Sequence, residues 1–154
     1  MPVDRAGIMS TSVVCQVGLV VRDIEKSAKA YADLFGVDAP AWSLTDAEET
    51  AHTRYRGHPS QARAKLAFFR LGSVSLELIE PVGGPSTWQE FLETRGEGVH
   101  HIAFEIEDMA EQVSVLEEQG MPLVQRGDYT GGEYAYIDSA ARLGVILELL
   151  RNDR

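Results

Sequence analysis

Four polar side chains stand in the middle of segments that otherwise have the composition of apolar strands: Gln16, Glu77, His101 and Glu148. A polar group in such a position is costly to bury unless it has a partner. A divalent cation would serve all four, because two carboxylates balance its charge while an amide oxygen and a ring nitrogen complete the donor set. Taken singly, a strand glutamate usually faces solvent, and a lone strand histidine is usually a hydrogen-bonded core residue. The combination of the four favours a metal site.

The chain carries the same pattern twice, and the first match relates Gln16 to His101. Residues 16–24 read QVGLVVRDI, and residues 101–109 read HIAFEIEDM. Each segment is a short apolar strand followed by a charged residue, an aspartate and the start of a helix. An internal repeat of this kind indicates two copies of one structural unit. Chance similarity between short strands is the simpler alternative, but a second match in the same order argues against it.

That second match relates Glu77 to Glu148. Residues 73–80 (SVSLELIE) and residues 144–150 (GVILELL) share a Leu-Glu-Leu sequence around the two carboxylates. Polar residues therefore occupy equivalent strand positions in both halves. Packing of the halves about a pseudo-twofold axis would bring the four polar side chains together.

Hydrophobic periodicity and turn residues predict the elements that position these side chains. Strands are expected over residues 14–21, 64–71, 73–80, 99–106, 122–126, 133–138 and 144–150, and helices over 24–35, 86–95 and 108–120. Asp23 and Asp108 are expected to cap two of these helices, and Gly72 to turn a hairpin. Each half then has the order βαβββ.

His100 is a competing metal ligand because it is adjacent to His101. Successive residues of a strand point to opposite faces of the sheet. The alignment with Gln16 therefore selects His101, and His100 is expected to face the other way.

The first half is longer because of a polar, irregular insert at residues 40–62. Its arginines, Arg54, Arg56 and Arg63, would attract an anionic substrate if they faced the site, and solvated loop charges are the plain alternative. The Gly131-Gly132 turn is expected to form a flap over the site. Aromatic residues are candidate pocket walls, although such residues more often pack in the core: Trp42, Tyr55, Phe69, Trp88, Tyr134 and Tyr136.

The composition is that of a globular protein, with 154 residues of which 44% are hydrophobic and 25% charged. A formal net charge of −10 disfavours a nucleic-acid partner. No apolar run approaches the roughly 18 residues of a membrane helix, so no membrane partner is expected. Cys15 is the only cysteine, which excludes an intrachain disulfide and fits a reducing, cytoplasmic setting.

With these features the chain resembles the vicinal oxygen chelate superfamily, which includes glyoxalase I, methylmalonyl-CoA epimerase, bleomycin-resistance proteins and extradiol dioxygenases. The resemblance runs from about Val13 to Leu150 and rests on QVGLVVRDIEKSAKAYADLFG, LGSVSLELIEP, GEGVHHIAFEIEDM and GVILELL. It implies an α+β fold of two βαβββ modules that form a cupped mixed sheet around a metal, and a homodimer. The family's ligand positions fall on Gln16, Glu77, His101 and Glu148.

The expected organisation is a single domain over residues 1–154. Its first module covers about 13–81, a linker helix about 86–95, and the second module about 98–150.

Departures from the family pattern reduce the number of activities that the resemblance implies. Gln16 stands where many members have histidine, and the resulting ligand set matches that of eukaryotic glyoxalase I. Those enzymes hold glutathione with an arginine and an asparagine, at positions where this chain has Val20 and Pro81, so a glutathione hemithioacetal is not the expected substrate. The LELIEP and HHIAFEI stretches are closer to the epimerase-like branch, whose usual first ligand is also histidine, so acyl-CoA specificity does not carry over.

The expected function is a divalent-metal-dependent isomerase, epimerase or lyase that acts on a small oxygenated carbonyl compound. The cation would polarise the carbonyl, Glu148 would remove the α-proton, and the metal would stabilise the enolate. Glu77 is the second candidate for the base. Zn, Ni, Co, Mn and Fe all suit the donor set. The alternatives are a metal-free protein that sequesters a small molecule such as a drug, and another metalloenzyme such as a dioxygenase, which a single histidine disfavours.

Overall fold

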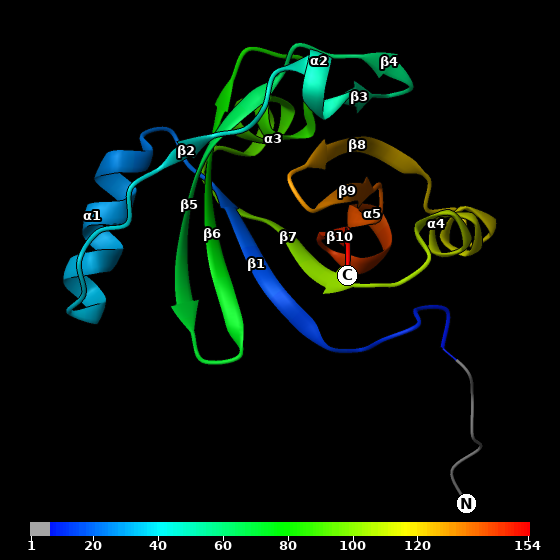
Figure 1. Ribbon diagram of the computed structural model, residues 1–154, viewed down its shortest axis with the longest axis horizontal. Helices are drawn as coiled ribbons and strands as arrows, with labels where there is room; N and C mark the ends of the chain where they lie inside the picture. Colours follow the sequence, from blue (N-terminus) through cyan, green and yellow to red (C-terminus); the bar gives the residue numbers. More distant parts are fainter. Residues whose placement is uncertain (1–6) are drawn as a thin grey trace, which may run out of the picture.

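The computed structural model describes residues 7–154 and shows one mixed sheet that curls into a half-barrel, with its main helices on the outside (Figure 1). The first six residues of the predicted domain lie outside the described part. The strand order is β2-β5-β6-β1-β7-β10-β9-β8-β3-β4. The strands are β1 (Val14–Val20), β2 (Ser43–Leu44), β3 (Arg54–Tyr55), β4 (His58–Pro59), β5 (Arg63–Leu71), β6 (Val74–Val82), β7 (Gly98–Glu105), β8 (Leu123–Tyr129), β9 (Gly132–Ile137) and β10 (Ile146–Asn152). The α+β half-barrel fold is confirmed.

The helices are α1 (Ile24–Phe35), α2 (Glu48–Ala51), α3 (Thr87–Arg95), α4 (Met109–Glu118) and α5 (Ala140–Leu143). α1 and α4 pack on the convex side of the sheet, whereas Trp88 of α3 packs with Val20, Ile79 and Tyr136 on the concave side.

α1 and α4 begin where their caps predict. Asp23 accepts a hydrogen bond from the backbone N–H of Lys26, and Asp108 accepts one from that of Glu111, so each carboxylate satisfies a free donor of the first turn. No helix in residues 7–154 is long and apolar enough to cross a membrane.

Four long strands form the centre of the sheet, in the order β6-β1-β7-β10. β1 runs parallel to β6, β7 runs parallel to β10, and β1 and β7 are antiparallel. In the β1–β7 register, Gly18 is aligned with His101, and Gln16 is aligned with Ala103. Exchanging the two strands maps this pairing onto itself. The register therefore has the pseudo-twofold symmetry that the sequence repeat predicts.

Residues 43–59, which we call the strap, run between the two edges of the curled sheet (Figure 1). At one edge β2 pairs with β5, and the N–H of Thr45 donates to the carbonyl of Ala64. At the other edge β3 pairs with β8, and β4 pairs with β3. The predicted irregular insert thus contains short pieces of strand and helix that bridge both edges of the half-barrel.

Several element ends differ from the predictions by a few residues; β8, for example, runs to Tyr129 rather than to residue 126. The second strand of the first half, β2, has only two residues and depends on β5 for its pairing. In the second half, α5 takes up residues before β10, so that β10 begins at Ile146 rather than at residue 144.

Candidate metal centre

The Leu-Glu-Leu repeats direct Glu77 and Glu148 to the concave side of the sheet. Leu76 and Leu78 are buried in the cluster beneath α1, and the leucines on either side of Glu148 are buried in the cluster with residues of α4. Because successive strand residues alternate between faces, the glutamate between each leucine pair points into the half-barrel. Only 6% of Glu77 and 4% of Glu148 is exposed.

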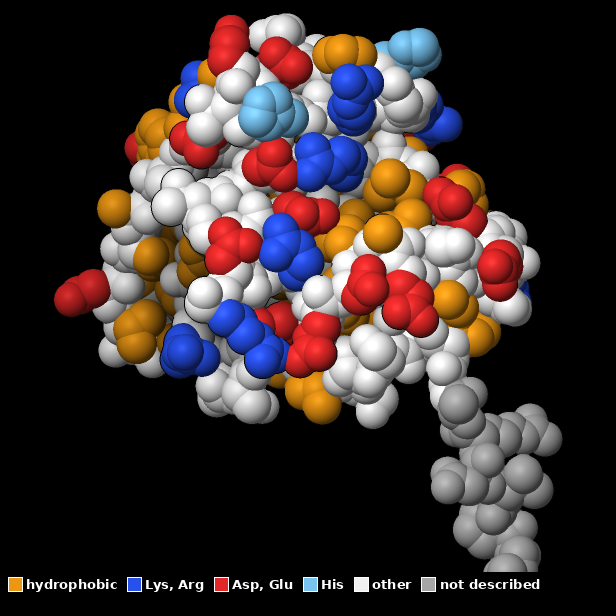
Figure 2. All heavy atoms as spheres, turned by 45° about the vertical axis from the view of Figure 1, so that its right-hand side comes forward, with side chains coloured by type: hydrophobic (Ala, Val, Ile, Leu, Met, Phe, Trp, Pro, Cys, Tyr) orange, Lys and Arg blue, Asp and Glu red, His pale blue; other side chains and the backbone are white. Residues whose placement is uncertain are grey.

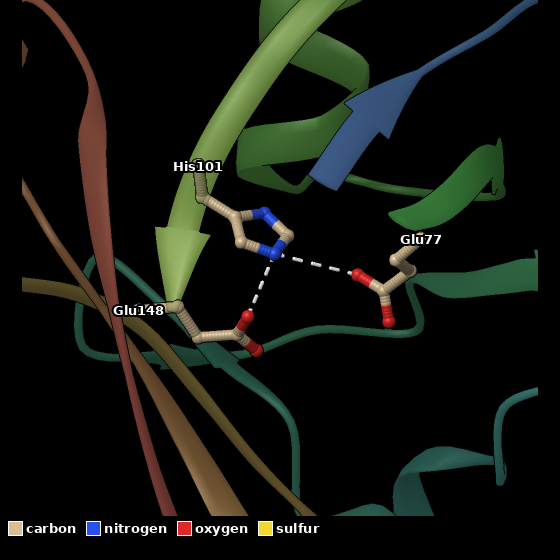
Figure 3. A group of neighbouring side chains, drawn as sticks. All are labelled: Glu77, His101 and Glu148. Carbon is tan, nitrogen blue, oxygen red and sulfur yellow. Dashed lines mark ion pairs between the residues drawn. The ribbon is translucent and has the colours of Figure 1, made fainter. Parts of the chain in front are cut away.

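The side chains of the other three polar residues converge on one nitrogen, Nε2 of His101. Figure 3 shows the carboxylates of Glu77 and Glu148 directed at this nitrogen. Oε1 of Gln16 lies 2.9 Å from it, Oε2 of Glu148 lies 2.7 Å from it, and Oε1 of Glu77 lies 3.4 Å from it. The residues come from the four central strands of a single chain. The structure therefore brings together every predicted ligand, and their role in holding a metal remains a prediction.

One proton cannot satisfy this arrangement. A ring nitrogen carries at most one hydrogen, whereas three oxygens approach Nε2 of His101. Oε2 of Glu148 is fully buried and, within residues 7–154, has no hydrogen-bond donor in suitable geometry despite its closeness to the ring. Ligand atoms of Glu77, His101 and Glu148 all lie within 4.8 Å of one another. A divalent cation fits this donor set, because it binds several oxygens and a nitrogen at once.

Without a cation, burial disfavours the charged forms of the side chains in this site. Burial, followed by the charge on Glu148, raises the pKa of Glu77 to about 8. Burial also acts to lower the pKa of His101, but the two carboxylates outweigh it and raise that pKa above its usual value. A cation between the carboxylates would favour their charged forms.

Small residues form the floor beneath these side chains. Gly18 lies between His101 on one neighbouring strand and Glu77 on the other. A β-carbon at position 18 would fall inside the imidazole ring of His101. Ala103 occupies the equivalent place between Gln16 and Glu148. Gly18 is not among the predicted site residues, although the repeat aligns it with Ala103 and so places it on the same floor.

The prediction that His100 faces away from His101 is wrong. The β1–β7 register shifts next to His101, so simple alternation does not hold there, and the rings of His100 and His101 both pack against Tyr136. Nδ1 of His100 lies 2.9 Å from Nδ1 of His101, and Nε2 of His100 lies 3.2 Å from Oγ1 of Thr87 at the start of α3. Burial, together with the charge of His101, lowers the pKa of His100 well below its usual value, so the ring is neutral. His100 also lines a separate cavity of about 170 Å³. It is therefore placed to orient His101 rather than to compete with it.

A cavity of about 520 Å³ opens above the cluster. Gln16, Glu77 and Glu148 lie in its lining, which is completed by the strap, by β5 and by the β8–β9 hairpin. Residues 128–130, at the tip of that hairpin beside the Gly131-Gly132 turn, belong to the lining. A cavity of this size is typical of small-molecule sites.

The aromatic predictions are right for the second half of the chain and wrong for the first. Trp88, Tyr134 and Tyr136 line the cavity, whereas Trp42, Tyr55 and Phe69 do not. Phe69 is instead buried beneath α1, and its neighbour Phe68 lines the cavity. The signal for Phe68 was present in the sequence: the hairpin around Gly72 aligns Phe68 with Glu77, and aligned cross-strand residues share a face.

The three arginines do not line the cavity, and Arg63 lies directly after the insert, at the start of β5. Arg56 pairs with Glu90 at 2.9 Å, and Nε of Arg63 donates to the carbonyl of Thr45 at 2.8 Å. Arg54 lies on β3 at the edge of the sheet. Their contacts fit the alternative explanation, that they are surface charges of the strap and its neighbours.

Comparison with protein families places this chain in a known superfamily. A family model described as Glyoxalase/Bleomycin resistance protein/Dioxygenase superfamily matches residues 15–137. The chain belongs to this superfamily, and the resemblance predicted from the sequence is confirmed.

The individual relatives include one uncharacterized protein and two proteins named as epimerases. An uncharacterized protein, YqjC of Bacillus subtilis, is 39% identical over 92 residues, which are 58% of this chain and 66% of that relative. An ethylmalonyl-CoA/methylmalonyl-CoA epimerase of Cereibacter sphaeroides is 27% identical over 113 residues, 73% of this chain and 74% of the epimerase. A methylmalonyl-CoA epimerase variant of Streptomyces coelicolor, solved with 2-nitronate-propionyl-CoA, has the same fold, with a TM-score of 0.64, 21% identity, and coverage of 93% and 96% of the two chains.

Proposed function

We propose that this protein is a metal-dependent epimerase or isomerase that moves a proton at a carbon next to a carbonyl group. The observation that carries the proposal is the convergence of three oxygens on Nε2 of His101, which can give a hydrogen to only one of them. The epimerase names of relatives in the same superfamily support the reaction class.

Gln16, Glu77, His101 and Glu148 would hold the cation. The bound cation would act as a Lewis acid that polarises a substrate carbonyl and makes the adjacent proton more acidic. Nδ1 of His101 is turned toward His100, which leaves Nε2 directed at the oxygens. Gln16, which is half-buried, stands nearer the solvent than the fully buried His101.

Glu148 is the proposed proton carrier, because its carboxylate lines the cavity and lies 2.7 Å from Nε2 of His101. Removal of a proton from one face of the substrate, with a second acid such as Glu77 or water delivering a proton to the other face, would give epimerisation. Return of the proton to a neighbouring carbon would give isomerisation. Glu77 is the alternative carrier, because its raised pKa shows that its surroundings accept a neutral carboxyl group.

The first experiment measures metal directly. Tag-free protein is analysed by plasma mass spectrometry, stripped of metal, and titrated with Zn, Ni, Co and Mn salts. We expect about one divalent ion per chain, and loss of that ion in His101→Ala. A cation at 100 times its Kd should stabilise the fold by about 2.7 kcal/mol.

A second experiment tests the reaction class. The metal-loaded protein is incubated in D₂O with methylmalonyl-CoA and, separately, with a neutral α-hydroxyketone, and deuterium at the α-carbon is followed by NMR. Exchange above the rate of the metal-free protein supports the proposal. Absence of metal binding together with tight binding of a small molecule would instead favour the second candidate, a ligand-sequestering protein, for which the large cavity is the supporting observation.

A further inference from the structure

We infer that the cavity selects an uncharged, largely apolar oxygenated carbonyl compound and rejects substrates with a carboxylate or phosphate on their distal part. The part of this inference in which the carbonyl end of the substrate chelates the cation rests on the proposed function. The preference of the cavity walls for an uncharged body does not depend on it.

The first observation is the charge of the lining. Its charged side chains are all carboxylates, namely Asp46, Glu77, Asp128 and Glu148, and within residues 7–154 no lysine or arginine reaches the cavity. A divalent cation would balance Glu77 and Glu148 but would leave no positive charge over for a second anionic group. A carboxylate or phosphate elsewhere in the cavity would therefore lose its hydration without gaining an ionic partner.

The second observation is that three basic residues close to the lining already form ion pairs. Lys65 lies 3.2 Å from Glu80, Arg126 lies 2.5 Å from Asp128, and Arg151 lies 2.8 Å from Glu133. On the face shown in Figure 2, lysine and arginine side chains are interspersed with acidic ones rather than gathered in a patch. Recruiting any of these cations to an anionic substrate would break an existing ion pair.

The third observation is the apolar wall. Leu66 and Phe68 on β5 and Leu44 on the strap line one side of the cavity. Phe68 is 46% exposed and Leu44 is 40% exposed, even though both lie in a concave site. Covering such side chains with an apolar ligand body removes their surface from water, which favours binding.

These observations favour a different substrate from the CoA thioester in the names of the epimerase relatives. Methylmalonyl-CoA carries a free carboxylate and several phosphates, whereas the walls described here offer carboxylates, aromatic rings and leucines. The shared reaction class and the different substrate class are compatible, because the chelating residues and the walls come from different elements.

The test uses two probes that differ only at their distal end. A p-tolyl methyl α-diketone presents two neighbouring carbonyl oxygens and an apolar tail, and its p-carboxyphenyl analogue presents the same carbonyls and a charged tail. Binding of each is measured by titration calorimetry on zinc-loaded and on metal-free protein. We expect the tolyl probe to bind at least tenfold more tightly in both states, and methylmalonyl-CoA to compete weakly with it.

A matched pair of variants isolates the wall. Leu44→Lys places a cation in the lining, whereas Leu71→Lys adds the same charge at the tip of the β5–β6 hairpin, outside the lining. Both leucines are 40% exposed, so neither substitution disturbs the core. Leu44→Lys should reduce the preference for the tolyl probe at least threefold, and Leu71→Lys should leave that preference unchanged.

The possible outcomes separate this inference from the proposed function. Equal or tighter binding of the carboxylate probe or of methylmalonyl-CoA would overturn the inference, as would an equal effect of the two lysine variants. A protein that binds no metal but still prefers the tolyl probe would refute the proposed function and support the selectivity of the walls.

Discussion

The imidazole ring of His101 lies over Gly18 of the neighbouring strand, in the space that a β-carbon would fill. The backbone at Gly18 does not adopt the left-handed conformation that favours glycine. Glycine is therefore required there for steric reasons alone. In the other half of the sheet, Ala103 takes the equivalent place opposite Gln16, whose side chain leaves room for a methyl group.

Gly18→Ala should displace the ring of His101 and weaken metal binding. The new methyl group would push the imidazole away from the three oxygens, and overpacking of this kind costs about 1–3 kcal/mol. We expect zinc affinity to fall by at least about tenfold, the equivalent of roughly 1.4 kcal/mol, when measured by calorimetric titration of metal-free protein.

The control is Ala103→Gly, which changes the same floor by the same methyl group in the opposite direction. Ala103→Gly should lower the melting temperature slightly, because glycine weakens a strand. It removes a methyl group without displacing a ligand, so zinc affinity should stay within about twofold of that of the unmodified protein. If Gly18→Ala binds zinc as tightly as the unmodified protein, the ring is not held in the position described.

The stability of the metal-free protein should decline as pH rises from about 4.5 to about 8. Burial raises the pKa of Glu77 from 4.5 to about 8 in the folded state, so between these values the folded chain binds a proton that the unfolded chain has released. This contribution is fully present below the unfolded pKa and lost as pH passes the folded pKa. His101, whose folded pKa is also raised, acts in the same direction.

Chemical denaturation at a series of pH values measures this slope. Glu77→Gln should flatten it, and Glu93→Gln on the exposed side of α3 serves as a control for the loss of one carboxyl group. Saturating zinc should reverse the trend, because metal binding requires deprotonated ligands and strengthens with pH. An identical slope in Glu77→Gln would show that this carboxyl group does not titrate as described.

The central sheet could be predicted because its signals are local and repeated. Alternation, the Leu-Glu-Leu matches and the caps at Asp23 and Asp108 each depend on a few neighbouring residues. The strap could not be predicted in the same way. β2 and β3 have two residues each and no periodic pattern, and they are strands only because the edges of β5 and β8 supply their hydrogen bonds.

The same distinction between local and non-local signals applies to the residues of the site. Alternation and the repeat are enough to place Glu77 and Glu148 on one face, and the hairpin around Gly72 could have placed Phe68 opposite Glu77 as well. The support of His101 by His100 and the fit of its ring over Gly18 depend on side-chain rotamers and on the packing of α3, which strand periodicity does not encode.

Glu148→Gln should keep the fold and lose proton transfer. Glutamine is close in shape to glutamate but cannot carry the proton, and general-base catalysis contributes roughly 10²–10⁴-fold to rate. We expect α-deuterium exchange by the metal-loaded variant to fall by about that factor. Glu77→Gln should reduce metal affinity more than it reduces the exchange rate at saturating metal. If exchange survives in Glu148→Gln and is lost in Glu77→Gln, the roles of the two carboxylates are reversed.

Replacement of His100 should loosen the metal site without touching its ligands. A histidine ligand whose other ring nitrogen is hydrogen-bonded keeps its orientation, and loss of such a partner typically costs about 10–100-fold in metal affinity. In His100→Leu the Nδ1 atom of His101 has no partner on that side, so we expect zinc affinity to fall within this range.

His100→Asn distinguishes orientation from packing, because the asparagine side chain retains a polar atom near the position of Nδ1 but cannot reach Thr87 as the imidazole does. It should restore part of the zinc affinity that the leucine variant loses. Nitrogen-15 NMR of the imidazole groups provides the second readout: in zinc-loaded protein with His100 intact, the Nδ1–H of His101 should show the chemical shift of a hydrogen-bonded group, and this hydrogen-bond shift should be lost in His100→Leu. Equal zinc affinity and an unchanged His101 signal in both variants would mean that the ring is held by the strand and by Gly18 alone.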